Sequence, residues 1–261
     1  MKSREWLGLW MTLGALVMLG SSVVFADERG MDHTAWDALL RRYVDAHGAV
    51  DYRAWHEEGR QALEVYLQRL AETDVSRLAN DEALTFWINA YNACVVQGVL
   101  EHYPIHSVKD VPGFFEKITY RIGKNSLTLN EIESRGRTLG DWRVHFALVC
   151  ASSSCPFLRR EPYVAGRLDE QLTEQTRRFL ADAQRGVRVE GRTLWLSKIF
   201  DWYKRDVIPA GELGWLGRLT PEKLLPRIEP YLDRDIAQAI RSKRLSISFL
   251  DYDWSLNEQH K

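Results

Sequence analysis

The sequence predicts an α+β fold: a single domain with a buried central helix and a small, mostly antiparallel sheet. Helical patterns of apolar residues dominate the first and last parts of the chain, whereas the strand-like segments come mostly as hairpins. A regular alternation of strands and helices would instead indicate a doubly wound parallel sheet. One segment, residues 81–103, is apolar nearly all round, which is typical of a helix in the centre of a fold.

The individual elements follow from apolar spacing and from residues that stop helices. A first helix is predicted over residues 32–47, because Trp36, Leu39 and Tyr43 recur at helical spacing and Gly48 is a natural stop. The other elements are predicted, in order, as a helix at 61–72, the central helix at 81–103, a hairpin at 118–129, a helix at 130–137 capped by Asn130, a strand at 143–150, a helix at 166–183, a hairpin of 187–189 and 194–196, helices at 198–207, 221–232 and 233–242, and a strand at 245–249.

A line of polar residues runs along the apolar central helix. Thr85, Asn89 and Asn92 fall at positions i, i+4 and i+7, so they share one face. Buried amides are costly unless they are hydrogen-bonded. Two interpretations follow: Asn89 and Asn92 tie down neighbouring loops, as satisfied buried polar groups usually do, or they face a pocket and bind substrate.

The first 26 residues are typical of a signal peptide. Lys2 and Arg4 give a positive start, an apolar run follows at residues 6–19, and Ala26 suits the position before a cleavage site. The apolar run is shorter than the roughly 20 residues that a membrane-spanning helix needs. We therefore expect cleavage, a periplasmic or secreted mature protein, and no membrane span after signal cleavage.

The mature part, residues 27–261, is predicted to be one globular domain. It is long enough for a sizeable core, and it contains no linker-like stretch rich in Pro, Gly or Ser and no repeat. The formal net charge is −1, with both signs mixed along the chain, so the sequence does not indicate a nucleic-acid partner. We expect a peptide, amide or thiol substrate, or an envelope protein partner.

The segment RVHFALVCASSSCPFL, residues 143–158, is the candidate for chemistry. It holds two of the three cysteines, Cys150 and Cys155, and a histidine, His145, within an apolar run. A cysteine nucleophile needs a thiolate and a base within hydrogen-bond reach. On a regular strand positions 145 and 150 point to opposite faces, so Cys155 is the better partner for His145 if the loop folds back.

Three other interpretations of this segment stay open. Cys150 and Cys155 could form a structural disulfide, which an exported protein permits, or both could be packed thiols. A metal site from His145, Cys150 and Cys155 is the third, but their spacing is wider than in usual zinc knuckles. We expect no metal and no cofactor.

Five stretches of the chain are distinctive when taken together: FWINAYNA at 86–93, SLTLNEIE at 126–133, RVHFALVCASSSCPFL at 143–158, LSKIFDWYKRDV at 196–207 and YDWSLN at 252–257. They resemble the family known as domain of unknown function 547, found in bacteria and plants. Two departures are small: the usual second proline after the cysteine is Phe157 here, and the acidic spacer before Ile132 reads Asn130-Glu131.

The resemblance implies a fold more than an activity. The family is distantly similar to papain-like or transglutaminase-like thiol enzymes, which place the cysteine at the start of a core helix and the histidine on a later strand. Here His145 precedes Cys155, so the site would have to be permuted or degenerate. Plant members are often interpreted as partner-binding proteins, which supports a non-catalytic alternative.

Two functional hypotheses result, both for an exported bacterial member of this family. The first is a thiol-dependent acyl-transfer or hydrolytic enzyme with Cys155 as nucleophile and His145 as base. The second is a non-catalytic envelope domain that binds a partner and is stabilised by a Cys150–Cys155 disulfide. In the enzyme, Glu133 would act with the catalytic pair, and the substrate-binding residues would be Asn89, Asn92 and Cys150.

Overall fold

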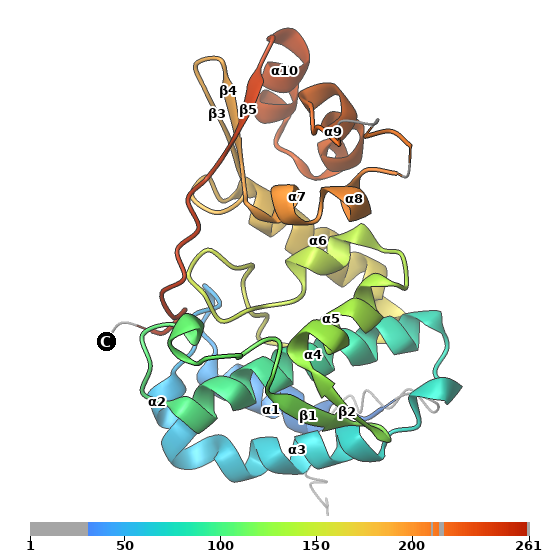
Figure 1. Cartoon of the computed structure of the whole chain (residues 1–261), viewed down its shortest axis with the longest axis vertical. Helices are drawn as coiled ribbons and strands as arrows, with labels where there is room; N and C mark the ends of the chain where they lie inside the picture. Colours follow the sequence, from blue (N-terminus) through green and yellow to red (C-terminus); the bar gives the residue numbers. More distant parts are fainter. Residues whose placement is uncertain (1–30, 210, 214–216, 260–261) are drawn as a thin grey trace, which may run out of the picture.

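Two hydrophobic cores organise the chain, and the elements that form them occupy the lower and upper parts of Figure 1. The computed structural model describes residues 31–209, 211–213 and 217–259, so the predicted signal peptide at 1–26 lies outside the described residues. The N-terminal core is built from buried residues between Trp36 and Leu172, together with Leu256. The C-terminal core is built from Phe146 and from buried residues between positions 179 and 240.

The helix α4 (Asn80–His102) is the centre of the N-terminal core. Nearly all of its side chains from Ala83 to Leu100 are buried, which confirms the predicted buried central helix. By length and composition it could also cross a membrane, but 94% of its apolar window is buried inside the protein. A helix that is apolar on every face needs such surroundings, and the neighbouring elements provide them.

Helices and one hairpin surround α4. Stacked aromatic rings join the first helices, with ring centroids 5.5 Å apart for Trp36 and Tyr66 and 5.0 Å apart for Tyr43 and Trp55. The prediction that Asn130 caps the helix after the hairpin is wrong, because the Thr128 hydroxyl accepts the capping bond from the amide of Glu131. The surrounding elements are α1 (Thr34–Tyr43), α2 (Tyr52–Ala54), the π-helical turn η1 (Trp55–Gly59), α3 (Arg60–Glu72), η2 (Val75–Arg77), η3 (Val108–Asp110), β1 (Thr119–Ile122), β2 (Asn125–Thr128) and α5 (Leu129–Arg137).

The upper part combines short helices with a three-stranded sheet. Antiparallel β3–β4 is the predicted second hairpin, and β5 adds to β4 in parallel, whereas β1 and β2 form a separate antiparallel pair. The α+β prediction with small, mostly antiparallel sheets is therefore confirmed. The elements after α5 are η4 (Trp142–Phe146), η5 (Ala165–Arg167), α6 (Leu168–Ala181), β3 (Val187–Glu190), β4 (Thr193–Leu196), α7 (Ile199–Trp202), α8 (Lys204–Val207), α9 (Pro221–Ile228), η6 (Glu229–Tyr231), α10 (Arg234–Ser242) and β5 (Ser246–Phe249). Of these, η5 and the first half of α6 pack on the N-terminal core, where Leu168 and Leu172 are buried.

The strand predicted at residues 143–150 is wrong. The segment starts as the 3-10 helix η4, which the Asp141 carboxylate caps by accepting a bond from the amide of Arg143, and it continues as irregular backbone. Val144 packs into the N-terminal core and Phe146 into the C-terminal core. Because residues 144–149 are buried between the two cores, their apolar run resembles a strand, and periodicity alone cannot distinguish the two.

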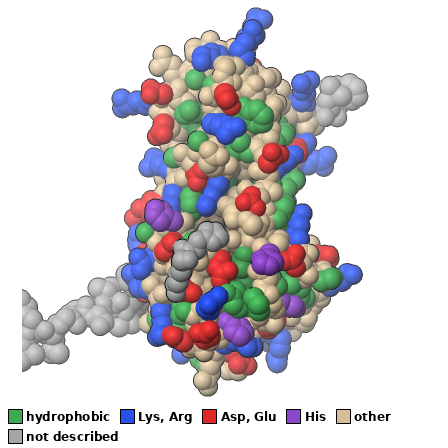
Figure 2. All heavy atoms as spheres, turned by 90° about the vertical axis from the view of Figure 1, so that its left-hand side faces the viewer, with side chains coloured by type: hydrophobic (Ala, Val, Ile, Leu, Met, Phe, Trp, Pro, Cys, Tyr) green, Lys and Arg blue, Asp and Glu red, His purple; other side chains and the backbone are tan. Residues whose placement is uncertain are grey.

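After β5 the chain returns to the N-terminal core along the left of Figure 1. Isolated bridges join this C-terminal segment, residues 250–259, to Ser107, Ser152 and Val50. The return path carries Tyr252 past the loop that holds the two neighbouring cysteines. The surface beside it has acidic and basic side chains interspersed over the face shown in Figure 2, in keeping with the net charge of −1.

Candidate functional site

A pocket of about 350 Å³ lies where the two cores meet. Tyr91 of α4 and Leu148 come from the N-terminal core, and Ile199 of α7 comes from the C-terminal core. Residues far apart in the sequence therefore converge on one cavity. Four of the six predicted site residues line it: Glu133, His145, Cys150 and Cys155.

The loop between the two cysteines is folded by the C-terminal segment. The amide of Ser153 donates to the carbonyl of Ser255 at 2.8 Å, and the amide of Ser154 donates to the carbonyl of Asp253 at 3.1 Å. Ala151 takes up a left-handed backbone conformation, with φ of 61°. These constraints turn the chain back on itself, so that two cysteines five positions apart meet at the pocket wall.

The two thiols are in direct contact and neither is part of a disulfide. The Sγ atoms of Cys150 and Cys155 are 2.7 Å apart. The Cys150 sulfur also lies 3.1 Å from the Ser152 hydroxyl and 3.2 Å from the Tyr252 hydroxyl. The Cys155 sulfur in turn accepts a bond from the backbone amide of Cys150 at 2.8 Å. Three groups that can donate a hydrogen bond thus surround the Cys150 sulfur.

This arrangement separates the acidities of the two thiols. Burial raises the pKa of Cys150, but hydrogen bonds from Cys155, Ser152 and Tyr252 outweigh it and lower the pKa from 9.0 to about 7. Burial, together with the bond to Cys150, raises the pKa of Cys155 well above its usual value. The hydrogen bonds therefore favour the thiolate at Cys150 and the protonated thiol at Cys155.

His145 is held by Asp206 and Tyr203 rather than by the two thiols. Its Nε2 is 2.9 Å from the Asp206 carboxylate, and its ring stacks on Tyr203 with centroids 4.0 Å apart. Burial lowers the pKa of His145 to about 4 despite the bond to Asp206, so the imidazole is neutral at neutral pH. Among the described residues, no hydrogen bond joins His145 to Cys150 or Cys155, although all three line the pocket.

Glu133 is connected to His145 through Arg137 and Asp206. Burial raises the pKa of the Glu133 carboxyl, although Tyr203 and Arg137 donate hydrogen bonds to it. The Arg137 guanidinium lies 3.4 Å from Glu133 and 2.8 Å from Asp206. Glu133 is thus a carboxyl group with an elevated pKa, held by an arginine that also holds the partner of His145.

Comparison with protein families assigns the central part of the chain. Residues 75–180 match the model of a family described as "Protein of unknown function, DUF547". The chain is a DUF547 member over these residues. The family resemblance predicted from the sequence is therefore confirmed, and the DUF547 match contains Glu133, His145, Cys150 and Cys155. Comparisons with curated proteins and with solved structures gave no significant match.

Asn89 and Asn92 do not line the pocket. The Asn89 amide donates to the carbonyl of Tyr163 at 2.8 Å and accepts from the Tyr163 amide at 3.0 Å. The Asn92 amide donates to the carbonyl of Ala147 at 3.0 Å and accepts from the amide of Val149 at 2.9 Å. Both side chains therefore clamp loops of the DUF547 segment, and Asn92 holds the backbone that leads directly into Cys150.

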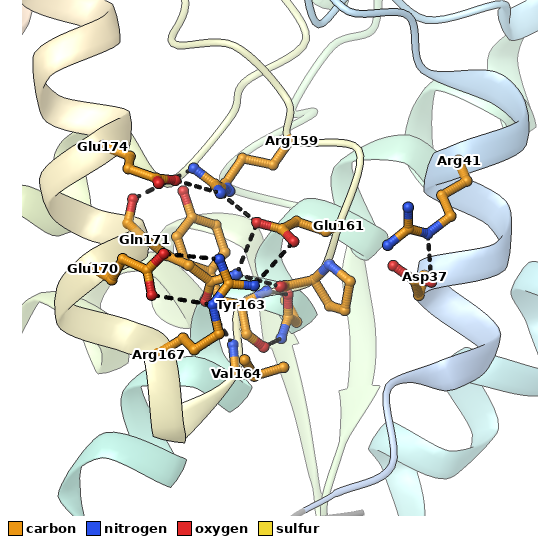
Figure 3. Close-up of polar contacts among 12 residues, drawn as sticks. Asp37, Arg41, Arg159, Glu161, Tyr163, Val164, Arg167, Glu170, Gln171 and Glu174 are labelled. Carbon is orange, nitrogen blue, oxygen red and sulfur yellow. Dashed lines mark hydrogen bonds and ion pairs between the residues drawn. The ribbon is translucent and has the colours of Figure 1, made fainter. Parts of the chain in front are cut away.

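The basic residues that follow Cys155 do not serve the thiols. Arg159 is paired with Glu161 and with Glu174 at 3.0 Å, within the ionic cluster drawn in Figure 3. Arg160 donates to the carbonyl of Arg41 at 3.1 Å. Both arginines thus bind groups of α6, α1 and the loop instead of the thiols. Hydrogen bonds, rather than a nearby cation, lower the pKa of Cys150.

Sequence reasoning missed the residues that complete the site from outside the DUF547 match. Tyr203 and Asp206 lie in the stretch 196–207, and Tyr252 lies in the stretch 252–257, both of which carried the family resemblance without an assigned role. Their place within the stretches that resemble the family was the available signal. Within the described part of the chain, no group of three or more His, Cys, Asp or Glu side chains is arranged to hold a metal ion.

Proposed function

We propose that this protein is an exported, thiol-dependent enzyme that transfers or hydrolyses an acyl group, with Cys150 as its nucleophile. The observation that carries the proposal is the convergence of three hydrogen-bond donors on the Cys150 sulfur at the wall of a pocket. The thiolate is the nucleophilic form of cysteine, and a low thiol pKa in a cleft is a mark of reactive cysteines.

The proposal exchanges the roles that the sequence suggested for the two cysteines. Cys155 is only 3% exposed, and its sulfur both contacts Cys150 Sγ and accepts the Cys150 amide. A buried thiol with a raised pKa is a poor nucleophile but a good hydrogen-bond donor to a neighbouring thiolate. Cys155 accordingly acts as a positioning residue that holds Cys150 in its reactive form.

The reaction needs only groups that line the pocket. The Cys150 sulfur attacks the carbonyl carbon of the substrate and forms a C–S bond, while the bond to the leaving group breaks and that group takes the proton of the Glu133 carboxyl. Water then adds its hydroxyl to the thioester carbon and returns a proton to Glu133, and the thiolate leaves. An amine or thiol acceptor in place of water completes a transfer.

Asn130, rather than the predicted substrate-binding residues Asn89 and Asn92, polarises the substrate carbonyl in this proposal. It lines the pocket from the first turn of α5 and carries the only side-chain amide among the described lining residues. An amide N–H directed at a developing oxyanion is a common catalytic device. His145 and Asp206 act indirectly in this proposal, because they hold Tyr203 beside Glu133.

The volume of the pocket indicates the size of the substrate, and the signal-like N-terminus indicates the compartment in which the protein acts. A volume of about 350 Å³ is at the small end of ligand sites, which suits a side chain or a small amide, peptide or thiol compound. The signal-like residues 1–26 support action in the periplasm or outside the cell.

Acylation of the cysteines tests the proposal directly. The mature protein is incubated with p-nitrophenyl acetate, and the acetyl group is located by peptide mass spectrometry. We expect acetyl-Cys150 in the wild type and in the matched control Cys94→Ser, slower acetylation of Cys150 in Cys155→Ser, and none at this loop in Cys150→Ser. Acetylation of Cys155 in preference to Cys150 would refute the assignment.

The contact between the two sulfurs also favours a second candidate. Exchange with an oxidised protein disulfide of the envelope, which leaves as a dithiol, would join thiols 2.7 Å apart in a disulfide with little movement of the chain. Such a disulfide would remove the thiolate and leave an envelope domain that binds a partner. The same protein, isolated without reductant, distinguishes the candidates: acetylation at Cys150 requires a free thiol, and a disulfide forbids it.

A further inference from the structure

We propose that the pocket selects substrates that carry a positive charge, such as an ammonium or guanidinium group, next to the acyl group that reacts. The charge would be held by the aromatic corner, which we define as Trp202, Tyr252 and Trp254. This inference rests on the proposed role of Cys150 and adds the substrate class to it.

The aromatic corner offers ring faces at the edge of the pocket. Its ring centroids are 4.8 Å apart for Trp202 and Tyr252, and 4.7 Å apart for Tyr252 and Trp254. Trp202 is 47% exposed although it lines the pocket, which is unusual for so large an apolar side chain. Ring faces of Trp and Tyr attract cations, most strongly in sites that exclude water.

The charges in the pocket wall have one sign. Glu116 lines the pocket, the Glu133 carboxyl is the proton donor of the proposed reaction, and none of the described lining residues is a lysine or arginine. His145 adds no positive charge, because burial keeps its imidazole neutral. A thiolate at Cys150 would add a further negative charge. An anionic substrate would therefore meet repulsion and a cationic one attraction.

Two cations that contact residues of the pocket lining are engaged by groups of the protein. Arg137 is held by Glu133 and Asp206. Lys109 lies over Trp254, with its Nζ 4.0 Å from the ring centroid. The second contact places a cation of this chain on one ring of the corner, and it leaves Trp202 and Tyr252 for a ligand.

Three methanethiosulfonate reagents test this inference, because they share one reaction and differ in charge. In each, the Cys150 sulfur forms a disulfide with the sulfenyl sulfur and methanesulfinate leaves with the bonding electrons. The reagents carry a trimethylammonium-ethyl, a methyl or a sulfonatoethyl group. Site-resolved rates at Cys150 are divided by the rate of each reagent with 2-mercaptoethanol, which removes differences in intrinsic reactivity.

We expect the normalised rate of the cationic reagent at Cys150 to exceed that of the anionic reagent by roughly tenfold or more. Trp202→Phe keeps a ring and should retain most of this ratio, whereas Trp202→Leu keeps apolar bulk without a ring and should lose a large part of it. Glu116→Gln should also lower the ratio. Glu64→Gln, on the exposed face of α3 and outside the pocket lining, is the matched control and should not.

The outcomes separate this inference from the function on which it rests. Rapid modification of Cys150 with equal normalised rates, or with a preference for the methyl or sulfonatoethyl reagent, overturns the cationic substrate and leaves the nucleophile in place. Modification of Cys155 in preference to Cys150 by every reagent overturns both. A cationic preference that Trp202→Leu does not change overturns the assignment to the aromatic corner.

Discussion

At the scale of single residues, the sequence indicated four side chains that line the pocket, but not the roles of the two thiols or the partners that set their acidity. Cys150, Cys155, His145 and Glu133 all line one pocket. Which of the two thiols has the lower pKa depends in part on Tyr252, a hydrogen-bond donor about a hundred positions away in the sequence. Such a contact is set by the return path of the chain after β5, and no local pattern around the cysteines encodes it.

The Tyr252 hydroxyl should be measurable as a shift in the pH dependence of Cys150. In the wild type, alkylation of Cys150 should rise with pH, reach half its maximum near pH 7 and level off above it, because only the thiolate reacts. Tyr252→Phe removes one donor and should move the midpoint upward, towards the ordinary thiol pKa. Tyr103→Phe, whose hydroxyl donates to Glu258 instead, should leave the midpoint in place.

At the scale of elements, apolar spacing predicted most helices and both hairpins, and it failed where the chain runs between two cores. The buried helix α4 matched its prediction within a residue at each end. Residues 143–150 are apolar because packing surrounds them, and their backbone is held by Asn92 rather than by a neighbouring strand. Side-chain clamps of this kind are invisible to periodicity, so the geometry of the thiol loop could not be predicted.

Loss of the hydrogen bonds of Asn92 should lower both the stability of the fold and the alkylation rate of Cys150. Asn92→Ala leaves the carbonyl of Ala147 and the amide of Val149 buried without their partner, which should lower the free energy of unfolding by roughly 2–4 kcal/mol. Alkylation of Cys150 should slow, because the clamped backbone leads into it. Gln97→Ala, at a partly exposed position of the same helix, is the control for both denaturant unfolding and alkylation. Unchanged unfolding in Asn92→Ala would show that the clamp contributes little.

At the scale of the whole molecule, the candidate site belongs to neither core alone. The N-terminal core supplies the cysteines, the C-terminal core supplies α7, and the C-terminal segment joins both by passing from β5 to the cysteine loop. A site between two packed regions is a common place for ligand pockets. It also explains why composition and spacing predicted the fold class well and the pocket only in part.

Two buried histidines should make the whole fold sensitive to acid. Burial lowers the pKa of both His33 and His145 to about 4, from an ordinary value of 6.5. Between these values the unfolded chain binds protons that the folded chain does not, so stability is full above pH 6.5 and falls as the pH drops towards 4. The loss between pH 7 and 5 should be about 2 kcal/mol for each histidine.

Substitution of one histidine isolates its share of this loss. His33→Gln keeps a polar partner for the Tyr66 hydroxyl, which lies 2.7 Å from His33 Nδ1, and removes the titration. Denaturant unfolding of the variant at both pH values should show a smaller difference than in the wild type. His47→Gln, at an exposed position, is the control. An equal difference in His33→Gln and wild type would contradict this assignment.

The central claim is that Cys150 is the reactive thiolate, and its most direct test is the alkylation rate of each cysteine. Mature protein isolated without reductant is treated with iodoacetamide at neutral pH, and modification is followed by peptide mass spectrometry. The structure predicts that Cys150 reacts fastest, the buried Cys155 more slowly, and Cys94, whose pKa burial raises, slowest of all. A Cys150–Cys155 disulfide in essentially all molecules, or a Cys155 that reacts before Cys150, would contradict it.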